Sequence, residues 1–273
     1  MQKIILAAAL TAIGVPLLAQ RQSAPPSDAN ANPPAATTSP AGSGGLTTGR
    51  GRGPAVPQGP APKLPDGRPD FSGVWQVAGP VGDLAQGMPK GASIPLNDAG
   101  TALMASRKSG DDPEANCLPT GVPRVAPYPM RMLQTPTHVF MLFEGNIHSY
   151  RQIFMNGKHP EDPDPTWYGH SVGHWEGNTL VVDTVGFNDK FWFDYKGHPH
   201  TEKLHTIEHY TRTDAGHMAI EVTIDDPGTY KQPFTTVGRA TLMPGAELLE
   251  YICQENNQHL QRLEGPVRGP GLN

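Results

Sequence analysis

From about residue 137 onward the chain is a series of predicted β-hairpins. Apolar and polar residues alternate with a period of two, which is typical of strands with one buried face. The alternating segments are HVFMLFE, IHSYRQIF, VGHWE, TLVVDTVGF, TIEHYTRT, HMAIEVTID, TTVGRATLM and ELLEYICQ. Turn sequences join them in pairs at Gly145-Asn146, Gly177-Asn178, Asp214-Ala215-Gly216 and Pro244-Gly245-Ala246. Four consecutive hairpins predict about eight antiparallel strands.

A sheet with this order of strands is expected to close on itself. Another strand, FSGVWQV, begins at Phe71. Up-and-down strands leave exposed edges unless the sheet closes. We therefore predict an all-β fold, an antiparallel meander of about 8–10 strands that forms a calycin-like barrel or a strongly curved sheet. An open sandwich is the alternative. One short helix is predicted near residues 97–109, with Asn97 as its N-cap.

Both ends of the chain lack the composition of a folded domain. Residues 1–19 have a basic Lys3 and then an apolar run of about 15 residues, typical of a cleaved signal peptide and too short to span a membrane comfortably. An uncleaved N-terminal anchor is the alternative. Residues 20–63, rich in Pro, Gly and Ala, predict a disordered tether, and residues 260–273 a flexible tail. A single β domain at 64–259 remains, in a periplasmic or secreted protein without a membrane span after cleavage.

The cysteine count and the charge narrow the chemistry further. The two cysteines, Cys117 and Cys253, predict a disulfide in an exported chain, with reduced thiols or shared metal ligation as alternatives. The net charge is −5 and no run of Lys or Arg is present, which argues against nucleic acid as a partner. The sequence does not determine an oligomeric state.

A candidate site lies between His159 and His209. This stretch holds seven of the eleven histidines and three of the four tryptophans, together with many carboxylates. Such a set suits a metal site, an acid–base site or a polar-rimmed ligand pocket.

Ligand-binding residues are predicted around the rigid, proline-rich segment DPDPTWYGH. Its two aromatic residues can stack on a ring or a sugar, although Trp167 can instead plug the end of the barrel. The predicted ligand-binding residues are Trp167, Tyr168, His170, Trp192 and His200.

One shared cleft at an end of the sheet is predicted for residues of two segments. The segments that precede VGHWE and follow TLVVDTVGF both leave the open end of the hairpin that turns at Gly177-Asn178. The residues predicted to border the cleft are Trp167, Tyr168, His170, His200 and His205.

A metal site is a further hypothesis. His198 and His200 point to the same side of an extended segment, and His205 can complete a set of three nitrogens for zinc or copper. Pro199 places the first two in a loop, and the spacing matches no standard zinc pattern. Polar loop histidines that bond to the backbone are the alternative.

An acid–base site is predicted from Asp183, which shares a strand face with Val181 and Val185. A carboxylate among apolar residues must be paired, or its pKa rises. His170, Asp183 and His205 are therefore the predicted catalytic residues, with a structural carboxylate as the alternative. The chain has no GxSxG, HExxH, phosphate-binding loop or dinucleotide motif. Ser171 directly follows His170 and does not lie in a nucleophile elbow, so we do not expect a serine hydrolase.

Two arginines, Arg124 and Arg151, lie near apolar residues. Each can clamp an anionic ligand with two hydrogen bonds or form a buried pair with a carboxylate.

A resemblance is carried by longer strings. PDGRPDFSGVW, CLPTGVPR, QTPTHVFMLFEGN, PTWYGHSVGHWEGNTLVVDTVGFND and LHTIEHYTRTD resemble a family of exported bacterial proteins of unknown function, over nearly all of residues 64–257. The resemblance implies one exported domain. It implies no reaction, cofactor or catalytic residue.

Three functions follow from these observations. The first is an exported β-barrel protein that binds a small, partly apolar molecule in a cleft lined by His and Trp. The second is a metal-assisted or acid–base hydrolase or isomerase that uses the same His and Asp residues. The third is a structural or envelope-interaction protein in which the tether matters most.

Overall fold

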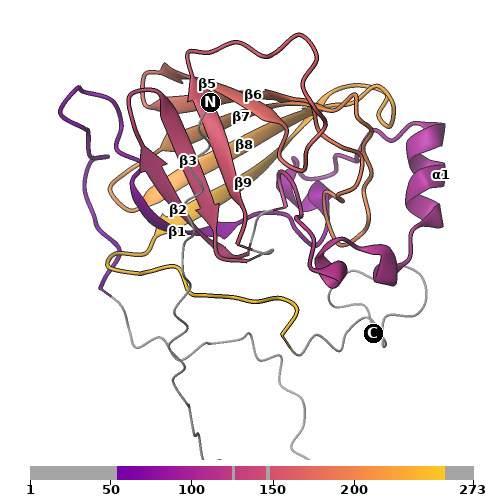
Figure 1. Cartoon of the computed structure of the whole chain (residues 1–273), viewed down its shortest axis with the longest axis horizontal. Helices are drawn as coiled ribbons and strands as arrows, with labels where there is room; N and C mark the ends of the chain where they lie inside the picture. The colour runs from indigo at the N-terminus through magenta and orange to yellow at the C-terminus, as the bar shows by residue number, and fades with distance from the viewer. Residues whose placement is uncertain (1–53, 125–126, 146–147, 256–273) are drawn as a thin grey trace, which may run out of the picture. The chain divides into compact units, whose positions relative to one another are not determined.

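Nine strands form one closed barrel in the computed structural model, which describes residues 54–124, 127–145 and 148–255 (Figure 1). The strands pair in chain order, and β9 pairs back onto β1. They are β1 (Gly73–Ala78), β2 (Pro129–Gln134), β3 (His138–Phe143), β4 (Tyr150–Met155), β5 (His170–Glu176), β6 (Thr179–Val185), β7 (His205–Arg212), β8 (His217–Asp225) and β9 (Phe234–Leu242). The helical elements are α1 (Asp98–Ser106), η1 (Leu84–Gly87), η2 (Ser109–Asp111) and η3 (Glu114–Asn116).

The predicted fold class is confirmed. The chain forms a β-barrel with a single α-helix in the described ranges, and α1 begins directly after Asn97. The Asn97 side chain accepts a hydrogen bond of 2.8 Å from the Gly100 N–H, as an N-cap does. The helix ends at Ser106, before the predicted end at residue 109. The turn at Gly177-Asn178 joins β5 to β6 as predicted, with Gly177 at φ +59°.

The predicted signal peptide at residues 1–19 and the predicted tail at 260–273 lie outside the described residues. The predicted tether at 20–63 is described only from residue 54. There the Gly59 carbonyl accepts a 2.9 Å hydrogen bond from the Ala215 N–H in the β7–β8 turn. Within the described part of the chain, no helix has the length and apolarity that crossing a bilayer requires.

Two predicted hairpins are wrong in detail. ELLEYICQ forms no strand, because β1 takes the place beside β9 and the disulfide ties Cys253 to Cys117. The β3–β4 connection runs over residues 144–149 and is longer than a two-residue turn. Strand β2 was not predicted, because its sequence PMRMLQ does not alternate clearly.

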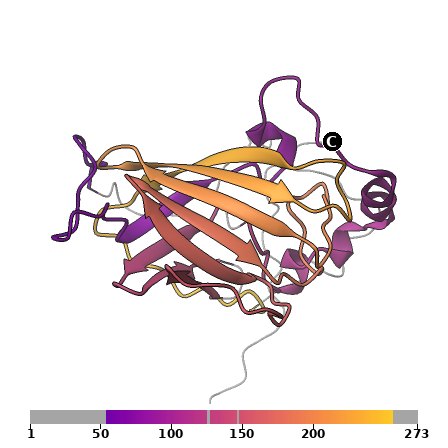
Figure 2. The same ribbon diagram turned by 90° about the horizontal axis from the view of Figure 1, so that it is seen from above.

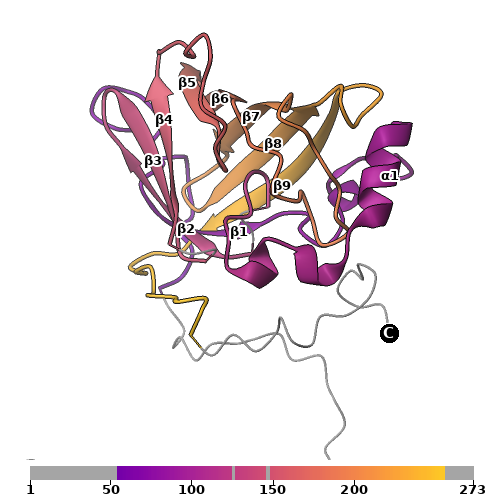
Figure 3. The ribbon, with the colours of Figure 1, turned by 45° about the vertical axis from the view of Figure 1, so that its right-hand side comes forward.

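One strand pair departs from the predicted antiparallel meander. β4 and β5 are parallel, with Ile153 opposite Ser171 and Met155 opposite Gly173. Parallel neighbours need a long connection that carries the chain back to the same end of the sheet. Residues 156–169 make this connection, and we call them the crossover (Figure 3). Most of its residues are exposed, so it runs on the outside of the barrel.

Side chains alternate between the interior and the outer face along each strand. Strands β6 to β9 lie side by side as one wall of the barrel (Figure 2). The inward residues of β1, β2, β3, β8 and β9 are largely apolar, and they include Trp75, Met130, Met141 and Val222. The polar inward residues lie on β4 to β7, which we call the polar wall: Arg151, Ser171, Thr184, Glu208 and Tyr210.

A buried ion pair organises this polar wall. The Arg151 guanidinium donates two hydrogen bonds to the Glu208 carboxylate, at 2.6 and 2.8 Å, and both side chains are almost completely buried. Arg151 also donates to Ser171 Oγ at 3.0 Å and to Thr184 Oγ1 at 2.7 Å. The Tyr210 hydroxyl donates to Glu208 Oε2 at 2.6 Å. Burial alone would lower the pKa of Arg151, but Glu208 outweighs it and raises this pKa.

Residues 112–124, which lie before β2, are held by a disulfide and by a buried arginine. The predicted Cys117–Cys253 disulfide is confirmed, with Cα atoms 5.5 Å apart. Arg124 is buried and donates to Asp112 at 2.7 and 2.9 Å and to Glu114 at 2.8 Å. Of the two alternatives for Arg124, the structure shows the buried pair with carboxylates, as it does for Arg151.

The ion pair predicts a large effect for a single substitution. Arg151→Met leaves the Glu208 carboxylate buried without a cation, so we expect urea unfolding to show a loss of about 3–5 kcal/mol. The double variant Arg151→Met/Glu208→Gln removes both charges and keeps an acceptor for Tyr210, so it should regain more than half of that loss. A single variant within about 1 kcal/mol of the parent would show that the pair is not a determinant of stability.

Candidate functional site

A groove lies on the outer side of the barrel between β4 and the crossover. Its volume is about 760 Å³. We call it the crossover groove, and it is lined by Pro119, His148, Ser149, Tyr150, Arg151, Gln152, Phe154, Pro160, Pro163, Asp164, Thr166, Trp167, Tyr168, Gly169 and His170.

The groove exists because β4 and β5 pair over only part of their length. The pairing covers Ile153 to Met155 of β4, so residues 150–152 have no partner on β5. Arg151 closes this opening from the inside, where its guanidinium bonds to Ser171 of β5. The same side chain lines both the groove and the interior cavity.

The walls of the groove are rich in aromatic rings. Tyr150 and Phe154 point outward from β4, and Trp167 of the crossover lines the same groove. Tyr150 is 62% exposed, which leaves its ring available to a ligand. Phe154 stacks on the His170 ring at a centroid distance of 4.9 Å and an angle of 10°. These rings offer flat apolar surfaces next to a histidine.

Tyr168 anchors the end of the crossover. Its ring stacks on Phe143 at 5.4 Å, and its hydroxyl lies 2.6 Å from Ser149 Oγ. Burial raises the pKa of Tyr168 to about 12, so the hydroxyl stays protonated at neutral pH. Gly169 follows at φ +64°, and a Cβ there would lie 2.6 Å from the Val185 carbonyl oxygen. Only glycine can adopt this positive φ and also avoid the contact with the Val185 carbonyl oxygen without strain.

A row of hydrogen-bonded side chains leads away from the groove over the outer face of β5, β6 and β7. His170 Nδ1 lies 3.0 Å from His159 Nδ1. His159 Nε2 lies 3.0 Å from Asp183 Oδ1, and His205 Nε2 lies 3.0 Å from the same oxygen. We call these four residues the histidine relay. Burial, and then the nearby His159, lower the pKa of His170, which favours its neutral form.

The relay contains all three predicted catalytic residues: His170, Asp183 and His205. His159, in the crossover, connects them, although its sequence context gave no reason to assign it a role. The predicted surroundings of Asp183 are wrong, because its side chain is 41% exposed. Leu180, Val182 and Thr184 take the inward positions of β6, so Asp183 faces outward. Whether the three residues catalyse a reaction stays a prediction.

Two predicted ligand-binding residues lie away from the groove. His200 is 1% exposed, its ring lies 3.8 Å from that of Phe191, and burial lowers its pKa to about 4. Trp192 is buried under the Arg107 guanidinium, 4.8 Å from the ring centre. Trp167, Tyr168 and His170 do line the groove. Of the residues predicted to share a cleft, His205 connects to the groove only through the relay, and His200 is not among the lining residues.

The three predicted metal ligands have separate surroundings. His198 Nδ1 lies 2.5 Å from Asp194, His205 bonds to Asp183, and His200 Nε2 is buried with no partner among the described residues. Among the described residues, one group has ligand atoms that all lie within 4.8 Å of one another: Asp83, Asp194 and His198.

The oxygens of that group already have partners within the chain. Asp194 accepts from the backbone N–H groups of Leu84 at 2.6 Å and His198 at 3.1 Å. Asp83 pairs with Lys196 at 2.6 Å. These bonds fasten η1 to the segment before β7, and the cluster needs no metal ion to be satisfied.

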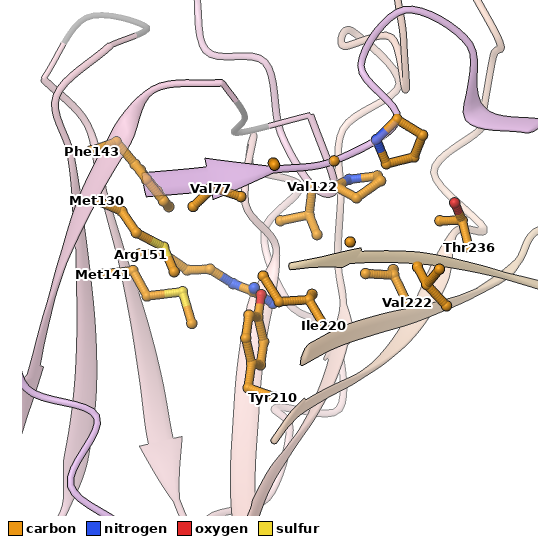
Figure 4. A pocket seen from close by; sticks show the side chains of 16 residues that line it. Val77, Val122, Met130, Met141, Phe143, Arg151, Tyr210, Ile220, Val222 and Thr236 are labelled. Carbon is orange, nitrogen blue, oxygen red and sulfur yellow. The ribbon is translucent and has the colours of Figure 1, made fainter. Parts of the chain in front are cut away.

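A small cavity lies inside the barrel. The cavity beside Arg151 and Tyr210 measures about 30 Å³, enough for about one or two water molecules. In Figure 4, Arg151 and Tyr210 point toward each other, with Met130, Met141 and Ile220 around them. A ligand larger than a few atoms does not fit in this cavity as it stands.

Comparisons with known proteins assign no family to the chain. No family model matches it, and no curated protein matches it. Among solved structures, it is similar to a crystal structure of a point mutant of the fluorescent protein UnaG, at 13% sequence identity and a TM-score of 0.31. The similarity covers 64% of this chain and 97% of the other. At this level of similarity, the function has to be argued from the residues of the chain itself.

The buried His200 predicts a specific pH dependence of stability. In the unfolded chain it takes up a proton near its ordinary pKa of 6.5, whereas the folded protein resists protonation until about pH 4. The unfolded chain binds this proton more tightly than the folded protein does. As the pH falls from 6.5 to about 4, the free energy of unfolding therefore decreases by about 3 kcal/mol because of this residue. Urea unfolding between pH 7 and pH 4 should show a flatter profile for His200→Phe than for the parent. The exposed control His174→Gln should keep the parent profile, and a parental profile in His200→Phe would refute the assignment.

Proposed function

We propose that this chain is an exported β-barrel protein that binds a small, partly apolar molecule in the crossover groove. The observation that carries the proposal is the groove itself, about 760 Å³ in volume, with several aromatic rings in its lining. Sites for small molecules typically measure about 300–1,000 Å³ and combine apolar walls with a few polar groups. The small size of the cavity beside Arg151 and Tyr210, about 30 Å³, supports a site on the outer side.

The charges around the groove support a neutral ligand. Arg151 is the arginine of the lining, and Glu208 already neutralises it with two hydrogen bonds. The Asp164 carboxylate also lines the groove. An anionic ligand would therefore meet a carboxylate and no unpaired arginine among the lining residues.

Export is supported by two independent features. The first residues have the pattern of a signal peptide, and a disulfide joins Cys117 to Cys253. Disulfides persist mainly in oxidising compartments such as the periplasm or the exterior. Both features are consistent with the exported family that the sequence resembles.

A second candidate function is an acid–base hydrolase or isomerase at the same groove. The observation that favours it is the relay from His170 through His159 to Asp183. A histidine oriented by hydrogen-bonded partners can act as a general base toward a molecule bound beside it. The metal-assisted form of this proposal is less well supported, because the predicted metal ligands have separate surroundings.

The binding proposal predicts a retained ligand that depends on the groove. Protein purified from the periplasm should carry a small molecule that native mass spectrometry detects. Tyr150→Ala removes an exposed aromatic wall and should reduce the retained fraction by about tenfold, the upper range for one aromatic contact. Leu133→Ala, at an exposed apolar position of β2 outside the groove lining, is the matched control. Equal retention by the parent and Tyr150→Ala would place the ligand elsewhere.

A further inference from the structure

The histidine relay determines where the proton sits on each ring. A carboxylate accepts hydrogen bonds and cannot donate them, so both His159 and His205 must present Nε2–H to Asp183 Oδ1. A neutral His159 carries one ring proton, and that proton is on Nε2. Its Nδ1 therefore has a free lone pair and acts as an acceptor.

The acceptor on His159 determines the state of His170. Their two Nδ1 atoms lie 3.0 Å apart, so when His159 is neutral the proton between them belongs to His170. The lowered pKa of His170 favours its neutral form, which has a single ring proton. With this proton on Nδ1, the Nε2 atom of His170 is an unprotonated acceptor.

The accepting nitrogen belongs to a residue that lines the groove. His170 lines the crossover groove, and no described residue forms a hydrogen bond with its Nε2. Stacking against Phe154 and the bond to His159 hold the ring in one orientation. The groove thus combines apolar rings with an acceptor in a fixed position.

We propose that the ligand of the crossover groove is a neutral ring compound that donates a hydrogen bond, through a hydroxyl or N–H group, to Nε2 of His170. This inference rests on the proposed function and specifies the class of molecule that the groove takes. His159 and Asp183 act as positioning residues, because they fix the tautomer of His170 and do not themselves line the groove. A compound of the same shape that presents only acceptors would face the lone pair of Nε2 and bind less well.

The tautomer can be measured without a ligand. In ¹⁵N-labelled protein at neutral pH, histidine ring nitrogens report which atom is protonated. We expect His170 to be protonated on Nδ1. His174, whose Nε2 lies 3.0 Å from Glu176, should show the opposite tautomer in the same spectrum. In His159→Ala, the preference of His170 for Nδ1–H should disappear, while the His174 signal stays unchanged. Protonation of His170 on Nε2 in the parent protein would overturn the inference.

The class of ligand can be tested with a matched pair of probes. 2-Naphthol donates a hydrogen bond, and 2-methoxynaphthalene has the same rings without the donor. Calorimetric titration should give about fivefold tighter binding of 2-naphthol, the fold-change for one hydrogen bond of about 1 kcal/mol. His170→Phe should abolish this preference. His174→Gln, on the same strand but outside the groove lining, should keep it.

The outcomes separate the inference from the proposed function. Equal binding of both probes, with Nδ1–H on His170, would overturn the ligand class and leave binding in the groove intact. Failure of both probes to bind would count against a groove for ring compounds, and with it against the ligand class, even if the tautomer is as expected. Preference for the naphthol that survives in His170→Phe would overturn the role of His170.

Discussion

The parallel pairing of β4 with β5 is the constraint on which the rest of the site depends. Because both strands run in the same direction, residues 156–169 must return along the outside of the barrel. This return brings Trp167 into the lining of the groove and His159 to Asp183 on β6. An antiparallel hairpin at this position would have neither the groove nor the relay.

The interior and the outer side of the barrel have different roles. Inside, Arg151 and Glu208 satisfy each other and fill space that a ligand would need, which leaves a cavity of about 30 Å³. Outside, the short β4–β5 pairing leaves a groove of about 760 Å³. The Arg151 side chain lines both the interior cavity and the groove, and it forms the inner limit of the groove. A buried ion pair thus stabilises the wall against which a ligand would bind.

Much of the fold could be predicted from sequence because it depends on local signals. Alternation, turn residues and the Asn97 cap gave most strands, one helix and barrel closure, and the cysteine count gave the disulfide. The parallel pair was not predictable, because strand alternation carries no information about direction. For the same reason His159 was missed: only the crossover brings it to His170. The burial of His200 could not be predicted either, because it depends on tertiary packing against Phe191.

The most direct test of this account is a crystal structure of the protein with 2-naphthol. The account predicts electron density for the two rings among Tyr150, Phe154 and Trp167, with the hydroxyl oxygen within hydrogen-bond distance of His170 Nε2. Density inside the barrel beside Arg151 and Tyr210, with the crossover groove empty, would contradict it.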